Sequence, residues 1–232
     1  MKPNALHLLG MATALLTLSA TAMAADTTNP PTLADRLDLG LNVGSLGLGG
    51  QVSWLLVPGK LSLRVGAHAY NYNHDTSADG IDYTGKLKLK NEMLTLDWHP
   101  FEGRFHLSAG VVANGNKFDL NAKPSAGGTY TINGKTYTAA QVGTLSAKVD
   151  FPSTAPYLGI GWGDSTTSAG LHFIGDIGVI SQGTPRAKIT ATGAAADPSL
   201  ATDVQQAEAQ LRNKLADFKL YPVLQLGLAY RF

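Results

Sequence analysis

The stretch that decides the fold is Tyr221-Pro-Val-Leu-Gln-Leu-Gly-Leu-Ala-Tyr-Arg-Phe232, at the end of the printed sequence. From Leu224 to Phe232 every second residue is large and apolar, and the residues between them are mostly polar or small. This period of two predicts a β-strand with one apolar face. In a sandwich a second sheet must cover such a face, whereas in a membrane the lipid covers it around a closed barrel.

The same alternation recurs along the chain. It predicts strands at 37–43, 46–56, 61–70, 84–98, 105–114, 145–162, 171–179 and 221–232. The phase of the apolar residues changes at Gly44-Ser45, which is either a bulge in one strand or a tight hairpin turn. A hairpin would pair Val43 with Leu46 and keep both apolar sets on one face. A loss of register is also expected near Asn91-Glu92.

The strand count favours the hairpin, because it gives eight strands instead of seven and bacterial single-chain barrels have even numbers. The connections at 57–60, 99–103 and 163–169 are short, and those at 73–83, 115–145 and 183–218 are long. Short connections at one end and long ones at the other are typical of outer-membrane barrels. The sequence therefore predicts an all-β fold, an eight-stranded antiparallel transmembrane β-barrel with long extracellular loops.

Two of the long connections contain local signals. Asn133-Gly134 predicts a β-hairpin with a mirror-type turn. Asp197-Pro198 supplies a helix cap and a proline at the first helical position. Apolar residues three or four apart from Leu200 to Phe218 then predict an amphipathic helix at 198–218, which we expect to dock on the rim as a cap.

The N-terminus predicts export. Lys2 precedes an apolar run from about Ala5 to Leu18, and Ala22-Met-Ala24 places small residues at the positions that signal peptidase requires. The run is shorter than the ~20 residues of a membrane-spanning helix. We expect a signal peptide at 1–24, a flexible periplasmic lead-in at 25–35 and the barrel at 36–232.

Composition excludes several classes of function. The chain is 15% charged with a formal net charge of +1, which gives no electrostatic reason to expect nucleic-acid binding. It has no cysteine, which excludes disulfides, thiolate metal sites and a cysteine nucleophile. No His-x-His pair is present, and the acidic residues of 75–82 lack the spacing of a calcium loop. We expect no cofactor and no metal.

The barrel interior is the candidate site. Eight strands enclose a space just wide enough for side chains, and unpaired charges there are costly. We therefore predict a polar network of ion pairs and hydrogen bonds that plugs the interior. Its members are Arg64, Asp97, His106, His172, Asp176 and Arg231, and the inward faces also carry Asp38, Asn42, Gln51 and His68.

All tryptophans of the chain fall beside the short connections. Trp54, Trp98 and Trp162 each end a predicted strand there, and the last strand ends in Tyr230 and Phe232. Amphipathic rings favour the membrane interface. These five residues predict one aromatic girdle on the periplasmic side.

Two alternatives of other classes remain open, namely a lipid A-modifying enzyme and a narrow channel. His106-Leu-Ser108 has a His-x-Ser spacing, and Asp97 lies across the adjoining turn. The side chains of His106 and Ser108 are both expected inside the barrel near its periplasmic end, which is the wrong depth for chemistry on the outer leaflet. His172 and Asp176 lie about 13 Å apart on one strand and cannot act as a direct pair. We therefore expect no catalytic residues.

Three stretches carry a resemblance to known proteins. The alternating last strand with its terminal Phe232 resembles the C-terminal signature of bacterial outer-membrane barrels. Leu94-Thr-Leu-Asp-Trp-His-Pro-Phe101 and Ala155-Pro-Tyr-Leu-Gly-Ile-Gly-Trp-Gly163 resemble segments of functionally uncharacterised proteobacterial outer-membrane proteins, small barrels of the OmpA/OmpX/OmpW-like type. The resemblance implies an outer-membrane location and a last strand that the barrel-assembly machinery reads, but it transfers no active-site residue.

The expected partners are membrane components. Outer-membrane lipid would surround the barrel, and lipopolysaccharide phosphates would contact lysines at the outer strand ends. These lysines are Lys86, Lys88, Lys90, Lys117 and Lys148. The sequence names no extracellular ligand, so the expected role is structural or surface interaction.

Overall fold

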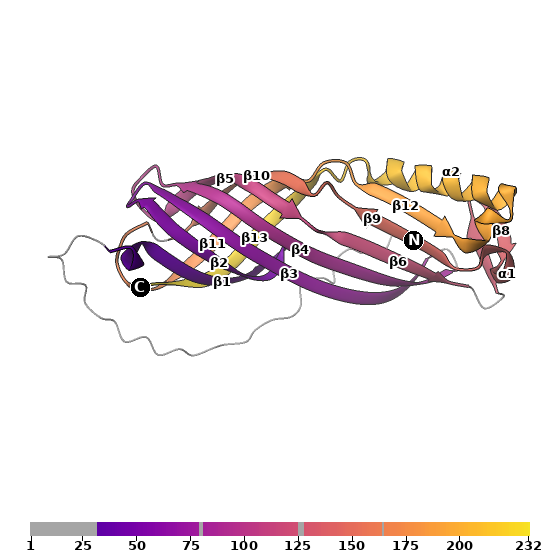
Figure 1. The fold of residues 1–232 in the computed structure, drawn as a ribbon, viewed down its shortest axis with the longest axis horizontal. Coiled ribbons are helices and arrows are strands. Elements are labelled where there is room, and N and C mark those ends of the chain that lie inside the picture. The colour runs from indigo at the N-terminus through magenta and orange to yellow at the C-terminus, as the bar shows by residue number, and fades with distance from the viewer. Residues whose placement is uncertain (1–31, 79–80, 125–127, 164) are drawn as a thin grey trace.

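The computed structural model describes residues 32–78, 81–124, 128–163 and 165–232 (Figure 1). The predicted signal peptide and residues 25–31 of the predicted lead-in lie outside these ranges. The described end of the predicted lead-in includes the start of a short 3-10 helix, η1 (Ala34–Arg36). Among the described residues no helix is long and apolar enough to cross a membrane.

Strands dominate the described chain. The first half contains β1 (Leu37–Gly44), β2 (Gly47–Val57), β3 (Leu61–Ala78), β4 (Ile81–Trp98), β5 (Phe105–Asn114), β6 (Lys117–Lys123), β7 (Thr129–Ile132) and β8 (Lys135–Thr138). The second half contains α1 (Ala139–Val142), β9 (Leu145–Asp150), β10 (Thr154–Trp162), β11 (Gly170–Ser181), β12 (Arg186–Ala191), η2 (Thr192–Ala195), α2 (Pro198–Leu215) and β13 (Leu220–Arg231).

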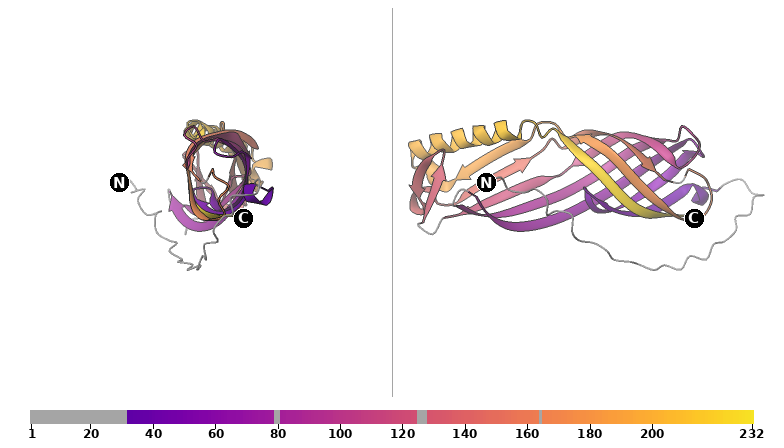
Figure 2. Two further views of the ribbon diagram at one scale, coloured as in Figure 1. Left: turned by 90° about the vertical axis from the view of Figure 1, so that its left-hand side faces the viewer. Right: turned by 180° about the vertical axis from the view of Figure 1, so that it is seen from behind.

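Eight strands form a closed antiparallel ring. Their order is β1, β2, β3, β4, β5, β10, β11 and β13, and β13 pairs with β1 to complete the circle. Figure 2 shows this ring end-on in its left panel. The predicted number of eight ring strands is therefore found, but the strand predicted at 145–162 divides into β9 and β10, and only β10 belongs to the ring. We call this part the ring, and its end that carries Phe232 the C-terminal end.

The hairpin predicted at Gly44-Ser45 exists, but its predicted register is wrong. Val43 pairs with Leu48 instead of Leu46, because Ser45 and Leu46 form the turn. Gly47 has a φ of 104°, a conformation that side chains disfavour, and this lets the chain reverse one residue later than expected. Leu46 is consequently buried inside the ring, whereas Leu48 is exposed on its outer face.

Beyond the ring the sheet continues as a second region, which we call the extension. β6, β9 and β12 prolong β5, β10 and β11, and they pair with the distal half of β4 in the order β4, β6, β9, β12. Residues 73–78 and 81–83 continue the β3–β4 ladder as far as the pair Ala78 and Ile81. The predicted long loops thus contain strands as well as helix α2, because short alternating segments such as Lys117–Lys123 find pairing partners that periodicity alone does not reveal.

The extension has its own apolar core. The predicted Asn133-Gly134 turn joins β7 and β8, with φ values of 51° and 79°. Helix α2 begins as predicted, since the Asp197 side chain accepts hydrogen bonds from the backbone of Ser199 and Leu200. The buried members of the core are Tyr130, Ile132, Tyr137, Val142, Ala191, Leu200 and Val204.

Helix α2 ends at Leu215 and lies beside β12, in the half of the molecule far from the C-terminus (Figure 1). Arg212 Nε donates to the Ala187 carbonyl at 3.2 Å, and Glu208 Oε2 accepts from the Ile189 backbone at 2.9 Å. The helix therefore docks on the extension and not on the rim of the ring, which corrects the expectation of a rim cap.

Candidate functional site in the ring interior

The ring is polar inside and apolar outside. On β3, Ser62, Arg64 and His68 are buried, while Val65 and Ala67 between them are exposed. The outer face of the ring carries exposed large apolar residues on all of its strands, among them Leu41, Leu48, Val65, Leu94, Val111, Leu158, Phe173 and Leu226. This alternation directs the polar side chains of eight strands toward one axis.

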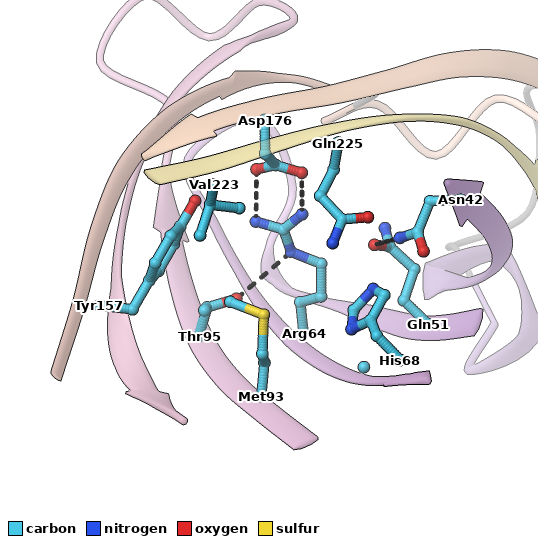
Figure 3. Close-up of a pocket in the computed structure, with 11 residues that line it drawn as sticks. Asn42, Gln51, Arg64, His68, Met93, Thr95, Tyr157, Asp176, Val223 and Gln225 are labelled. Atoms are coloured by element: carbon cyan, nitrogen blue, oxygen red, sulfur yellow. Dashed lines mark hydrogen bonds and ion pairs between the residues drawn. The ribbon is translucent and has the colours of Figure 1, made fainter. Parts of the chain in front are cut away.

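Arg64 is the centre of the interior (Figure 3). Its guanidinium binds Asp176 from β11 with both terminal nitrogens, at 2.5 and 2.8 Å. It also binds Asp97 from β4, with Nε 2.9 Å and Nη2 3.0 Å from the two carboxylate oxygens. One buried cation thus pairs with two buried carboxylates, an arrangement that needs these complementary hydrogen bonds to offset the cost of desolvation.

Short polar side chains complete this cluster. Ser108 donates to Asp97 Oδ1 at 2.6 Å, and Arg64 Nε donates to Thr95 Oγ1 at 3.3 Å. His106 Nε2 lies 3.3 Å from Asp176 Oδ1. The Ser108 hydroxyl therefore faces a carboxylate instead of a histidine, so this His-x-Ser spacing does not form a nucleophile and base pair.

A second cluster lies nearer the C-terminal end of the ring. Arg231 Nε donates to Asp38 Oδ1 at 3.1 Å, and other nitrogens of this guanidinium bind Asp38 Oδ2 and the Thr166 carbonyl. His172 Nε2 lies 3.6 Å from Asp38 Oδ2. The six predicted network residues thus separate into two clusters. Asp38 contacts both members of the second cluster. The alternation predicts that Asp38 faces inward but does not identify its partner.

Toward the extension the interior becomes amide-rich and then apolar. Asn42 Nδ2 donates to Gln51 Oε1 at 2.8 Å, and His68 and Gln225 are buried without a hydrogen-bond partner among the described residues. The cavity that these groups line is about 20 Å³, room for a single water molecule. Above them an apolar layer closes this end of the ring, made of Leu46, Val112, Ala155, Tyr157, Ile180 and Val223.

The five residues of the predicted aromatic girdle are exposed on the outer face of the ring. Their exposed fractions are between 42% and 52%, and each residue lies near the C-terminal end of the ring. They are Trp54, Trp98, Trp162, Tyr230 and Phe232. Tyr230 and Phe232 also contact each other edge to face, with ring centroids 5.4 Å apart.

Strand β4 crosses from the ring into the extension without a break in alternation. Its exposed positions are Lys86, Lys88, Lys90, Glu92, Leu94, Leu96 and Trp98. The register loss expected at Asn91-Glu92 is therefore wrong. What changes there is polarity, because the outer face turns from apolar to charged while the inner face turns from Thr95 and Asp97 to Leu89 and Leu87.

A separate polar cluster joins α2 to the β7–β8 hairpin. Asp203 accepts hydrogen bonds from Tyr137 Oη at 2.5 Å and from Asn133 Nδ2 at 3.0 Å, and Lys135 Nζ lies 3.0 Å from Asp203 Oδ2. These donors, the tyrosine first, lower the pKa of Asp203 to about 2. The same hydrogen bond raises the pKa of Tyr137 to about 12. Sequence patterns give no sign of this cluster, since Asp203 is 66 to 70 residues from its partners on the hairpin.

Within the described ranges, no group of three or more His, Asp or Glu side chains is arranged to hold a metal ion. His99 is buried in the turn after β4, with Nδ1 2.9 Å from the Gly103 carbonyl, and burial lowers the pKa of this histidine. His74 is exposed and stacks on Tyr72, with ring centroids 5.9 Å apart.

The fold has counterparts among solved structures. The crystal structure of Acinetobacter baumannii CarO is 20% identical, with a TM-score of 0.53 over 85% of this chain and 97% of that one. Acinetobacter baumannii CarO2 is 18% identical, with a TM-score of 0.53 over 84% and 98% of the two chains. No protein-family model matches this sequence, and no curated protein matches it either. The likeness to CarO and CarO2 shows a common fold.

Proposed function

We propose that this protein is an integral outer-membrane β-barrel with a structural or surface-interaction role, exported through a cleaved signal peptide. The observation that carries the proposal is the closed ring with an apolar outer face and a polar inner face. In water this arrangement would expose a continuous apolar belt, whereas in a bilayer the lipid covers it and all ring strands remain paired. The closed eight-strand ring also fits the small OmpA/OmpX/OmpW-like type.

Two borders support the placement of the membrane. The aromatic girdle marks the periplasmic interface, where Trp and Tyr side chains are enriched. The change from Leu94 to Glu92 and Lys90 on the outer face of β4 marks the other interface. The extension then lies outside the cell, and the short connections and Phe232 lie on the periplasmic side. The alternation that ends in Phe232 also suits recognition by the barrel-assembly machinery.

The charged outer face of the extension suits lipopolysaccharide. Lys88 lies directly opposite Lys117, and Lys148 lies opposite Lys188. Asp119 lies 3.7 Å from Lys88 Nζ and offsets part of the repulsion between these like charges, and the remaining positive charge suits phosphate, of which lysine is a common ligand. Lipopolysaccharide that co-purifies with the protein should therefore decrease when Lys88, Lys117 and Lys148 become glutamine. Lys60→Gln, at the other end of the ring, serves as the control, and equal losses in both would contradict this contact.

The interior supports a closed barrel instead of a channel or an enzyme. Arg64 occupies the axis between two carboxylates, and the apolar layer around Tyr157 lies above it. Water-filled barrels need many more strands than eight. Ser108 and His106 are buried, and both bind aspartates. We therefore propose no catalytic activity on lipid A.

The deciding experiment is membrane fractionation followed by a denaturing gel with and without heating. We expect the protein in the outer-membrane fraction and a slower-migrating heated form, because an intact barrel resists detergent until it is heated. Recovery of a soluble, heat-insensitive periplasmic protein would overturn the proposal.

Two further measurements address the other functions. Planar bilayers with refolded protein should show no steady ion conductance, and a steady conductance would favour the narrow channel. Alanine substitution of His68, His74, His106 and His172 should leave the lipid A acylation pattern unchanged by mass spectrometry. A changed pattern would favour the lipid A-modifying enzyme.

A further inference from the structure

A cavity of about 310 Å³ lies where the ring passes into the extension. Along β11 and β12, Ile180 belongs to the apolar layer that closes the ring, Gln182 and Pro185 line the cavity, and Ala191 belongs to the core of the extension. The same order is found along β10 and β9, where Ala155 belongs to the apolar layer and Phe151 and Val149 line the cavity. The cavity therefore separates the two apolar clusters of the molecule.

The lining of this cavity is mostly apolar, and its polar members are Asn116, Lys117 and Gln182. Its apolar walls include Leu87, Leu89, Phe118, Val149, Phe151 and Leu215. A buried apolar space of about 150 Å³ is enough to bind one benzene ring, and ligand pockets commonly begin at about 300 Å³. The size of the cavity therefore suits a molecule of one or two rings or a short alkyl chain.

Gln182 supplies one polar group to this lining. Its side chain is only 4% exposed, and Nε2 donates to the Phe218 carbonyl at 3.1 Å. This bond fixes the orientation of the amide, since a carbonyl can only accept. Gln182 Oε1 is then a buried acceptor without a partner among the described residues. Such a group is costly unless a donor binds it.

The cavity is bordered by the lipid-facing surface. Phe218 and Leu220 line it and are 61% and 62% exposed. Leu220 belongs to the same outer face of β13 as Leu224 and Leu226, which form part of the apolar belt. A lipophilic molecule concentrated at the outer border of the belt would therefore meet the cavity without crossing the charged face of the extension.

We infer that this cavity binds a small apolar molecule with one hydroxyl group, of the phenol or short-chain alcohol class, whose hydroxyl donates to Gln182 Oε1. The apolar walls hold the ring or chain, and the buried acceptor selects the donor. This binding site goes beyond the structural role proposed above. Ligand binding is measured on refolded protein whose heat-shifted migration has already been verified. A failure to bind would therefore leave the proposed location intact.

The test places a fluorescent reporter in the cavity. Phe151→Trp adds a tryptophan to the wall, whereas the three native tryptophans lie in the girdle at the opposite end of the ring. In lipid nanodiscs, 4-bromophenol should quench the added tryptophan saturably. Leu41→Trp on the lipid face, where the native residue is 73% exposed, is the matched control and should show only linear quenching by partitioned bromophenol. Linear quenching of both variants would overturn the inference.

The hydroxyl contact is tested separately. 4-Bromoanisole lacks the donor and should bind the Phe151→Trp protein about fivefold more weakly than 4-bromophenol, the effect expected for one hydrogen bond. Adding Gln182→Met should abolish this preference, and a preference that persists would overturn the role of Gln182. If Phe151→Trp does not refold, saturation-transfer NMR of 4-bromophenol on wild type replaces it. The signal should disappear in Val149→Phe, which fills the cavity, and an unchanged signal would overturn the site.

Discussion

The ring and the extension share the long strands β3 and β4 but have opposite polarity. In the ring, β4 presents Leu94 and Leu96 outward and Thr95 and Asp97 inward. In the extension the same strand presents lysines outward and Leu87 and Leu89 inward. The comparison shows that the strand backbone fixes the alternation of side chains between two faces. Which of these faces must be apolar depends on the medium around that part of the strand.

Each region therefore has its own source of stability. The ring buries charges that have to pair, and its outward apolar side chains would contact lipid in the proposed membrane location. The extension buries an ordinary apolar core between its sheet, the β7–β8 hairpin and α2. Removal of a buried group in one region should leave the other region intact, and the following predictions test that separation.

The largest effect is expected at the ring interior. Arg64→Met leaves Asp97 and Asp176 buried without their cation, which should cost roughly 3–5 kcal/mol of unfolding free energy. Urea unfolding of refolded protein in lipid vesicles measures it. Lys60→Met removes the exposed 3.4 Å pair with Glu102 and should cost at most about 0.5 kcal/mol. Equal shifts in the two variants would contradict the idea that the interior is organised around Arg64.

The second effect belongs to the extension. Leu200 is fully buried in its core, so Leu200→Ala should destabilise this region by about 2–5 kcal/mol through the lost burial and the remaining cavity. Limited proteolysis on intact cells should then cut α2 faster, while heat-dependent migration of the ring stays the same. A loss of both would show that the two regions unfold as one unit. Ala209→Ser, exposed on the same helix, is the control.

The third prediction compares the two outer faces. Leu226→Arg places a charge within the apolar belt and should cost about 2–4 kcal/mol in a bilayer. Lys88→Leu lies beyond the belt and should leave the unfolding free energy in vesicles unchanged within about 0.5 kcal/mol. Similar costs for both substitutions would mean that the border at Glu92 is placed incorrectly.

The smallest effect is a pH dependence confined to the extension. Since the pKa of Asp203 is lowered from 3.8 to about 2, its contribution is complete above pH 3.8 and is lost as the pH falls toward 2. Since the pKa of Tyr137 is raised from 10.0 to about 12, its contribution is complete below pH 10 and is lost as the pH rises toward 12. Amide hydrogen exchange of the β7–β8 hairpin measures the loss of stability at low and at high pH, and Asp203→Asn should remove the loss at low pH. A loss at low pH that persists in this variant would mean that another group causes it.

Local patterns predicted the elements but not their partners. Alternation identified Arg64, Asp97 and Asp176 as inward residues, and strand parity required the hairpin at Gly44-Ser45. The register of that hairpin was wrong, because Gly47 allows the turn to fall one residue later. The change at Asn91-Glu92 was mistaken for a register shift, since a reversal of polarity and a slip of one residue look identical in a pattern of apolar positions.

By itself, the sequence determined that the chain forms alternating strands, that the last strand from Tyr221 to Phe232 has one apolar face, and that aromatic residues gather beside the short turns. These properties depend on neighbours two residues apart, so they are visible in the linear order. Only the tertiary structure decided that Arg64 joins two aspartates, that Asp38 binds Arg231, and that segments of the long connections continue the sheet beyond the ring. Those contacts join residues far apart in the chain, and they exist only when the ring closes.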